Sequence, residues 1–306
     1  MTSGAISGAR PAEIRWHPTV VRYAPVVAIV LALIAIWYAA AVLMNRNIVR
    51  DAFERDEIHY TTGDLIAGTL SAERPLLPAP HQIIQTFAED VFGWPITSPR
   101  SLVYHGWVTL SATFVGFMLG ATFGIFLAVL IVHARTLQKS LLPWIICSQM
   151  VPILAVAPIV IVVLGAIGLR GLLPKAIISA YLCFFPVTIG AVKGLSSLDP
   201  IQRDLMRTWS ATPAQIFWKL RWPSAVPFLF TSLKVSITIS LIGAIVAELP
   251  TGAQAGIGAR LLAGSYYGQT IQIWAALVAA SVLAVGLIGI VSLAERWVAQ
   301  LMGARA

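Results

Sequence analysis

Charge-free stretches long enough to cross a membrane constrain this chain most. No Asp, Glu, Lys or Arg occurs in residues 23–45, 101–134, 140–169, 176–192 and 261–294, and Lys234 is the single interruption of residues 225–247. A helix that spans the hydrocarbon core needs about 20 apolar residues. The stretches therefore predict an all-α membrane protein with six transmembrane helices, at about 23–44, 108–132, 142–165, 173–193, 226–248 and 272–294.

The placement of lysine and arginine predicts the orientation of these spans. With the N-terminus inside, the inner segments hold most of the basic residues, whereas the short outer loops and their edges hold Arg170, Lys175 and Arg260. The positive-inside rule then puts both termini in the cytoplasm, residues 46–107, 166–172 and 249–271 outside, and residues 133–141 and 194–225 inside. The first span lacks a small-residue cleavage site, so we expect an uncleaved anchor rather than a signal peptide.

Motifs for metal ligation or nucleotide binding do not occur in the sequence. None of the five histidines has ligand spacing to another His or to a Cys, and Cys147 and Cys183 lie in separate predicted spans as expected core residues. No Gly-x-x-x-x-Gly-Lys-Ser/Thr motif is present. We therefore expect no catalytic residue, metal or cofactor in this chain, and any ATP and Mg that it depends on would be bound by another subunit.

Residues 204–223 are a polar, cationic segment rich in aromatic residues, between two apolar stretches. Loops between spans are usually short, so a segment of this length with helix signals of its own predicts a docking element. Thr212 can cap a helix whose first position is Pro213. Ile216, Phe217 and Leu220 then share a face, which predicts a short amphipathic helix that lies either on lipid headgroups or in a protein groove.

This segment resembles the cytoplasmic "EAA loop" of permease subunits in binding-protein-dependent ABC importers. In that motif an acidic-small-small triplet precedes a glycine, and a proline follows thirteen positions after the glycine; here Asp204-Leu205-Met206 replaces the triplet, Ser210 replaces the glycine, and Pro223 keeps the spacing. The resemblance implies an ATPase-coupling loop that includes Asp204, Arg207, Ser210, Ala211, Thr212, Ile216, Phe217, Lys219 and Pro223. Ala211, Ile216 and Phe217 would lie in a groove of the ATPase.

Two features inside the spans predict close packing and a broken helix. Gly116, Gly120 and Gly124 form overlapping GxxxG steps, which let a neighbouring helix approach closely. Gln149-Met150-Val151-Pro152 and Pro158 interrupt the 142–165 span. Proline removes backbone hydrogen bonds, which membrane proteins tolerate where protein or a water-filled cavity compensates. Gln149, Met150 and Pro152 are therefore candidates for a translocation pathway, with a harmless kink as the alternative.

The fifth span carries Ser232, Ser236, Ser240, Ala244 and Glu248 at four-residue spacing. We interpret the serines as a close-packing seam, with a mildly polar wall that includes Ser240 as the alternative. A carboxylate at this depth is costly and tends to face protein or water, so Glu248 is a candidate pathway or gate residue. Its alternative is an interfacial glutamate at the outer end of the helix.

Two outer segments are candidates for contact with a periplasmic partner. Pro80 opens a predicted helix in which Ile83, Ile84, Phe87 and Val91 share a face, and the Gly- and Ala-rich loop at 251–270 carries Arg260, Tyr266 and Tyr267.

Residues 77–298 resemble permease subunits of the nitrate, sulfonate and taurine class of ABC importers. The matching pieces are Leu77-Pro78-Ala79-Pro80, residues 150–169, the 204–223 loop, and Glu248 followed by a glycine-rich turn; residues 248–260 resemble branches that move heterocycles such as pyrimidine or flavin precursors. The resemblance implies a methionine-importer-like type I permease fold. It also implies a cytoplasmic ABC ATPase dimer, a second permease that is identical or related, and a periplasmic solute-binding protein as partners in the inner membrane.

The expected organisation follows from the spans and this resemblance. It comprises a cytoplasmic segment at 1–22, an anchor helix at 23–44, a periplasmic loop with an amphipathic helix at 45–107, an importer core at 108–298 that contains the 194–225 coupling loop, and a cytoplasmic tail at 299–306. The alternative function is an ion-coupled secondary transporter. Such proteins usually carry internal repeats and acidic or broken-helix sites in both halves, and Glu248 has no counterpart in the first half.

Overall fold

The computed structural model describes residues 18–250 and 254–303, and every regular element in these ranges is helical. The chain divides into two units, residues 1–81 and 82–306, each of which is described by itself. Five helices are long and apolar enough to cross a membrane, and a sixth span results if one sharply bent helix pair is counted as a single crossing. The six predicted spans therefore correspond to five single helices and one broken one.

The first unit is a long helix with a short helix packed near its end. α1 (Pro18–Arg55) continues well beyond the predicted boundary at residue 44, because residues 45–55 contain no Gly or Pro and Arg50 pairs with Glu54 one turn later. α2 (Thr62–Leu70) begins with a capping box between Thr61 and Asp64. The buried Asn45 amide donates to the carbonyls of Thr69 and Leu77 and thereby holds the following loop against α1.

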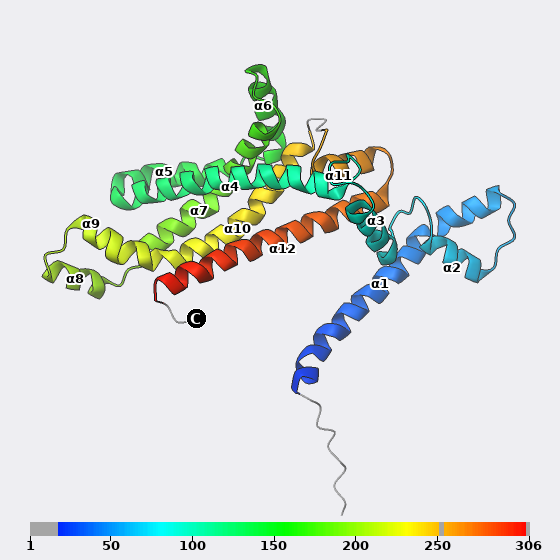
Figure 1. Cartoon of the computed structure of the whole chain (residues 1–306), viewed down its shortest axis with the longest axis horizontal. Coiled ribbons are helices and arrows are strands. Elements are labelled where there is room, and N and C mark those ends of the chain that lie inside the picture. Colours follow the sequence, from blue (N-terminus) through cyan, green and yellow to red (C-terminus); the bar gives the residue numbers. More distant parts are fainter. Residues whose placement is uncertain (1–17, 251–253, 304–306) are drawn as a thin grey trace, which may run out of the picture. The chain divides into compact units, whose positions relative to one another are not determined.

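The second unit is built around three helices, α4 (Leu102–His133), α7 (Leu172–Ser196) and α10 (Trp222–Glu248), with α12 (Thr270–Leu301) alongside (Figure 1). α3 (Pro80–Phe92) leads into this unit, and α11 (Ile257–Tyr266) lies between α10 and α12. The predicted helix at Pro80 is confirmed, although Ile84 is exposed and does not share the face of Ile83. The predicted 251–270 loop is wrong for residues 257–266, which are helical.

Three glycines of α4 form the contact with α7, as the GxxxG pattern predicted. A Cβ atom built at Gly116, Gly120 or Gly124 would lie 2.7 Å from a backbone carbonyl oxygen of α7, so no larger residue fits without separating the helices. Gly190 and Gly194 of α7 make the same kind of approach to α10. Small residues thus bring three backbones together, and side-chain packing completes the core.

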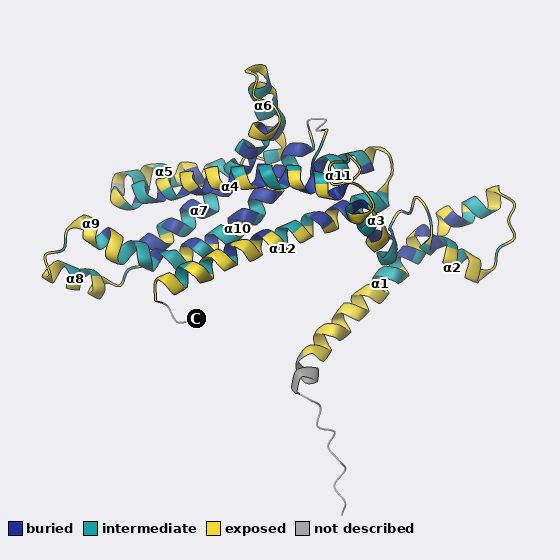
Figure 2. Cartoon of the chain, in the orientation of Figure 1, coloured by how far each residue is buried: buried dark blue, intermediate teal, exposed yellow. Residues whose placement is uncertain are grey.

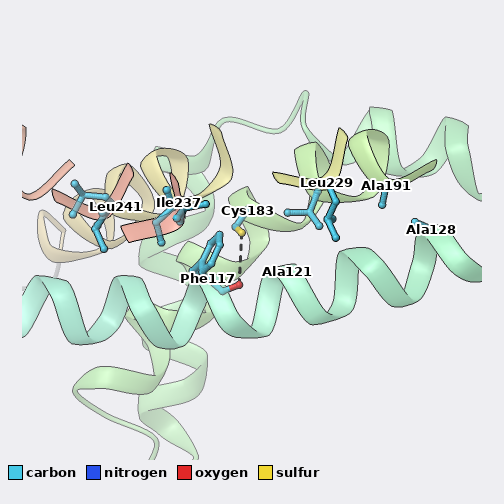
Figure 3. Packing of buried hydrophobic residues seen from close by; sticks show 11 residues of the cluster. Phe117, Ala121, Ala128, Cys183, Ala191, Leu229, Ile237 and Leu241 are labelled. Carbon is cyan, nitrogen blue, oxygen red and sulfur yellow. Dashed lines mark hydrogen bonds between the residues drawn. The ribbon is translucent and has the colours of Figure 1, made fainter. Parts of the chain in front are cut away.

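The main apolar cluster lies where these helices meet. Phe117 and Ala121 of α4 pack with Cys183 of α7 and with Ile237 and Leu241 of α10 (Figure 3). The Cys183 thiol donates to the Phe117 carbonyl at 3.9 Å, and its side chain is fully buried, as expected of a core cysteine. The same expectation is wrong for Cys147, which is exposed.

The predicted 142–165 span is not one straight helix. α5 (Arg135–Ser148) and α6 (Ile153–Ala166) meet at an angle of 94° (Figure 1). Pro152 is the N-cap of α6, and a proline disfavours helical backbone at the preceding residue, here Val151. The break predicted at residues 149–152 is therefore confirmed, whereas Pro158 lies inside α6 without ending it.

Candidate functional site

Within the second unit, parts of the 194–225 segment and of the 249–271 segment lie at opposite ends of α10. At the first end, Phe217 packs with Leu195 and Ala225 and against Val132 of α4. At the second end, Glu248 contacts Thr109 and the start of α11.

The coupling segment begins with α8 (Pro200–Thr208), a helix that the sequence analysis did not identify. Asp199 caps it by accepting a hydrogen bond from the Ile201 amide at 2.9 Å. Ile201, Leu205 and Trp209, at four-residue spacing, are 76%, 52% and 74% exposed and form an apolar stripe. Most of α8 is exposed (Figure 2). An Asp-Pro cap signal followed by this spacing was visible in the sequence and could have located α8.

Ser210 ends α8 in the left-handed region, with a φ of +54°. Its amide donates to the Arg207 carbonyl, and the Ala211 amide donates to the Met206 carbonyl, which is the Schellman pattern. Glycine is the residue that adopts this backbone without steric cost. The structure thus gives a physical reason for a glycine at this position of the resembled motif, and Ser210 takes the same conformation.

The helix predicted to begin after Thr212 is confirmed. Thr212 and Gln215 form a capping box at the start of α9 (Pro213–Ile216), and Pro213 is the first helical residue. A π-helical turn, η1 (Phe217–Arg221), then joins α9 to α10 without a break in the helical path. Arg207 and Asp204 form an exposed ion pair on α8, and Lys219 is exposed on η1.

Phe217 is not free to enter a groove of the ATPase, contrary to what the resemblance implied, because it is buried in its own chain. Its side chain is 8% exposed and packs with Leu195, Ala225 and Trp222, and its ring contacts the ring of His133. Ile216 and Leu220 are half-buried beside it, so the predicted face is present and turns toward the chain's own helices. Trp218 is the exposed aromatic residue of η1.

At the other end of the unit, Glu248 is fully buried in a polar cluster. Its carboxylate accepts hydrogen bonds from the Thr109 hydroxyl at 3.0 Å and the Gly258 amide at 2.9 Å, and it forms an ion pair with Lys175 at 3.2 Å. Lys175 also donates to the Ala255 carbonyl at 3.0 Å. Glu248 is the last residue of α10, as the alternative of a glutamate at the helix end requires, but protein groups rather than solvent surround its carboxylate.

The turn before α11 completes this cluster. Gly256 has a φ of +128°, and a Cβ atom there would lie 2.1 Å from the Glu248 carboxyl carbon. Its amide donates to His105 Nδ1 at 3.0 Å, so the ring proton of His105 is on Nε2, which donates to the Pro99 carbonyl at 2.8 Å. The glycine-rich turn therefore lets the backbone close over the Glu248 carboxylate.

The two outer segments that the sequence singled out separately are joined by an ion pair. Arg260 of α11 contacts Asp90 of α3 at 3.1 Å, with side chains that are 18% and 12% exposed. Burial raises the pKa of Asp90, and the Arg260 charge opposes this shift. Tyr266 and Tyr267, at the end of α11, are 80% and 71% exposed.

The structure does not bring the predicted pathway residues onto one surface. Ser240 is fully buried, donates to the Thr113 carbonyl at 3.0 Å and contacts the Ser179 hydroxyl at 2.6 Å, so it belongs to the packing seam of α4, α7 and α10. Met150 at the break between α5 and α6 is 74% exposed. Gln149 is half-buried, with its amide 3.5 Å from the Tyr181 carbonyl. The candidates at the α5–α6 break, which are Gln149, Met150 and Pro152, therefore do not form one site with Glu248.

Comparison with known proteins identifies the family. Residues 120–303 match the model of the binding-protein-dependent transport system inner membrane component. A probable ABC transporter permease of Haemophilus influenzae is 30% identical over 65% of this chain and 78% of its own length. The formylaminopyrimidine transport permease ThiX of Halalkalibacterium halodurans is 30% identical, covering 63% and 72%. The riboflavin transport permease RibX of Chloroflexus aurantiacus is 30% identical, covering 72% and 78%.

These matches decide against the secondary transporter. The permease is also not the catalytic subunit of such a system. The chain belongs to the family of binding-protein-dependent transport inner membrane components and is the multi-pass permease subunit of an ABC importer.

Proposed function

We propose that residues 194–225 dock on a cytoplasmic ABC ATPase dimer, which binds ATP and Mg. Through this segment the conformational change of the ATPase reaches the permease. The main support for this proposal is that apolar side chains of α8 are exposed, whereas Phe217 of the same segment is buried. Ile201, Leu205 and Trp209 offer an apolar surface to a partner, whereas Phe217 anchors the segment in its own chain. The loop residues Asp204, Arg207, Ser210, Ala211, Thr212, Ile216, Lys219 and Pro223 connect these two parts.

The geometry supports transmission by a rigid connection. The Schellman turn at Ser210 and the capping box at Thr212 satisfy the backbone groups between α8 and α9. From Pro213 to Glu248 the chain is continuously helical. A displacement of the exposed loop would therefore reach α10 through a helix rather than through a slack linker.

Co-purification of the ATPase with the permease tests this role. Trp209→Ala removes an exposed aromatic anchor, and Ala211→Asp introduces a charge into the proposed contact. Trp209→Ala should weaken retention of the ATPase about tenfold or more, because aromatic anchors dominate interface energetics. Ala211→Asp should weaken it at least as much, because a charge in a desolvated contact is costly. Trp297→Ala is a matched control, since Trp297 is 65% exposed on α12. If Trp209→Ala and Ala211→Asp retain the ATPase as well as Trp297→Ala does, the segment is an interfacial helix and the proposal fails.

We further propose that both termini are cytoplasmic, which puts residues 1–22, 194–225 and 299–306 inside and residues 45–107 in the periplasm. The distribution of Lys and Arg supports this orientation. Single cysteines at Ser71 and Thr212, in a background without Cys147 and Cys183, should react oppositely with a membrane-impermeant thiol reagent. Labelling of position 212 in intact spheroplasts would reverse the orientation.

For the remaining partners, we propose that α3 and α11 contact the periplasmic binding protein and that a second, identical or related permease completes the pathway. The Arg260–Asp90 pair supports the first assignment, because it makes one surface of two outer segments. The exposed apolar side chains of α6, such as Leu154, Ile159 and Val162, support the second. Cross-linking through single cysteines at Tyr266 and at Val162 tests the two contacts independently.

The solute that we propose is a heterocycle of the pyrimidine or flavin type rather than nitrate, a sulfonate or taurine. The support is the resemblance of residues 248–260 to heterocycle-transporting branches, together with the relatives named for formylaminopyrimidine and riboflavin. Uptake of labelled formylaminopyrimidine, riboflavin, taurine and nitrate, compared between cells with and without this permease, tests the proposal. Permease-dependent uptake of taurine or nitrate alone would overturn it.

A further inference from the structure

A polar pocket lies beside the coupling segment and has no role in the function described so far. Its volume is about 220 Å³, and it lies between the end of α4, the first turn of α5, the end of α7, α8 and η1. The lining residues are Val132, Gln138, Leu195, Ser196, Leu198, Arg203 and Arg221. We propose that this pocket binds the phosphate group of an anionic phospholipid whose acyl chain lies in the adjoining groove of α5.

The first argument is the unbalanced charge of the pocket. Among the residues that the structure describes, neither the Arg203 nor the Arg221 guanidinium forms an ion pair or a side-chain hydrogen bond. Arg203 Nε is inaccessible to solvent and has no hydrogen-bond partner. A buried N–H donor without a partner is destabilising, so an acceptor at this position is favoured. Two guanidinium groups that line one pocket suit a phosphate, which accepts several charge-assisted hydrogen bonds.

The partial charges of the helix ends around the pocket largely cancel. α5 begins without a side-chain cap, so its first-turn amides have no side-chain acceptor and favour an anion. The last turn of α7 contributes Leu195 and Ser196, and its carbonyl groups oppose an anion. The two arginines therefore decide the sign of the pocket.

The second argument selects a lipid over a free anion. Gln138 also lines a second hollow, an open apolar groove of about 530 Å³ formed by Lys139, Leu142, Pro143 and Ile146 of α5. α5 is the first half of the broken membrane span, so this groove faces the hydrocarbon region. A polar pocket that shares Gln138 with an apolar groove, in which Lys139 is the charged residue, matches a ligand with an anionic head and a hydrocarbon tail. A free phosphate or nucleotide would leave the groove unused.

The site adjoins the coupling segment, because Arg203 belongs to α8 and Arg221 ends η1. A bound phosphate would hold these two arginines together and so fix α8 relative to α10. The assignment to the inner leaflet rests on the proposed orientation, whereas binding of the lipid itself does not.

Native mass spectrometry of the purified importer complex, after delipidation and addition of dioleoyl phosphatidylglycerol, tests the proposal. The double variant Arg203→Gln/Arg221→Gln should retain the lipid about tenfold less than the parent, as expected for the loss of charge-assisted hydrogen bonds. Arg296→Gln is the matched control, since Arg296 is an exposed arginine on α12, outside the pocket. Ile146→Gln, at an exposed groove position, should also weaken retention while leaving the arginines in place.

Two further arms separate the possible anion sources. Dioleoyl phosphatidylcholine should be retained less than phosphatidylglycerol, and inorganic phosphate added without lipid should not protect the complex against thermal unfolding. Equal retention of phosphatidylglycerol by the double variant and by Arg296→Gln would overturn the proposal. Protection by inorganic phosphate alone, lost in the double variant, would instead identify a free-anion site and overturn the lipid assignment. Because lipid retention is the readout, these outcomes do not depend on whether the coupling segment binds the ATPase.

Discussion

The buried pair of Glu248 and Lys175 permits a double-mutant cycle whose outcome follows from its geometry. Glu248 is fully buried, and the Lys175 side chain is 11% exposed. Glu248→Gln keeps the shape of the side chain but leaves the lysine without its counter-charge, and Lys175→Met leaves the carboxylate without its cation. Breaking a buried pair on one side typically costs about 3–5 kcal/mol. We expect Lys175→Met to be the more damaging, because the carboxylate that remains is the more deeply buried group.

The double variant Glu248→Gln/Lys175→Met should be more stable than either single variant. Both charges are then gone, while the Thr109 hydroxyl and the Gly258 amide can still donate to the side-chain amide oxygen introduced at position 248. We expect a coupling of about 2–3 kcal/mol or more between the two sites, within or slightly above the usual range for contacting residues. In thermal unfolding of the detergent-solubilised complex, each single variant should lower the midpoint by roughly 6–12 °C.

Transport measurements on the same variants separate stability from gating. If Glu248 acts at the outer gate, the double variant should recover stability but not solute uptake in proteoliposomes. If the pair is purely structural, uptake should recover together with stability. Additive losses in the double variant would refute the reasoning, because they would mean that the two charges do not interact in the folded protein.

Three other substitutions probe separate features. Phe217→Ala should cost about 3–5 kcal/mol of stability, because it opens a cavity in a packed cluster; loss of ATPase co-purification at an unchanged unfolding midpoint would instead return Phe217 to the docking surface. Ser210→Gly should raise stability by about 0.5–1 kcal/mol, since it relieves a left-handed serine, and an unfolding midpoint below that of the parent would contradict this. Gly120→Val should prevent normal packing of α4 on α7, as monitored by gel filtration, whereas Gly286→Val, with no atom within 4 Å of the added Cβ, should not.

Much of the fold was predictable because hydrocarbon imposes simple rules. Apolar length located five single spans, and proline chemistry located the break at residues 149–152. The glycines of α4 identified a packing face, since few arrangements other than close helix contact require that spacing. The angle between α5 and α6 was not predictable, because it depends on how α6 packs against α7 and α10.

The polar sites were harder to predict because their partners are distant in the sequence. Glu248 stood out as a costly carboxylate, but Lys175 is 73 residues away and Thr109 is 139 residues away. Lys234 illustrates the same difficulty, because its partner Glu295 of α12 is 61 residues away. The face shared by Ile216, Phe217 and Leu220 was predictable, but not that Phe217 packs on Leu195 of α7, because that contact is distant in the sequence.

The packing of the second unit limits where this permease can bend. α4, α7 and α10 approach so closely at their glycines and buried serines that sliding one past another would bring backbone atoms into contact. These three helices should therefore move as one body. A change of direction outside this three-helix body lies at the break between α5 and α6. An ATPase that moves the coupling segment would thus displace the three-helix body as a whole, and the polar cluster around Glu248, at the far end of α10, would move with it.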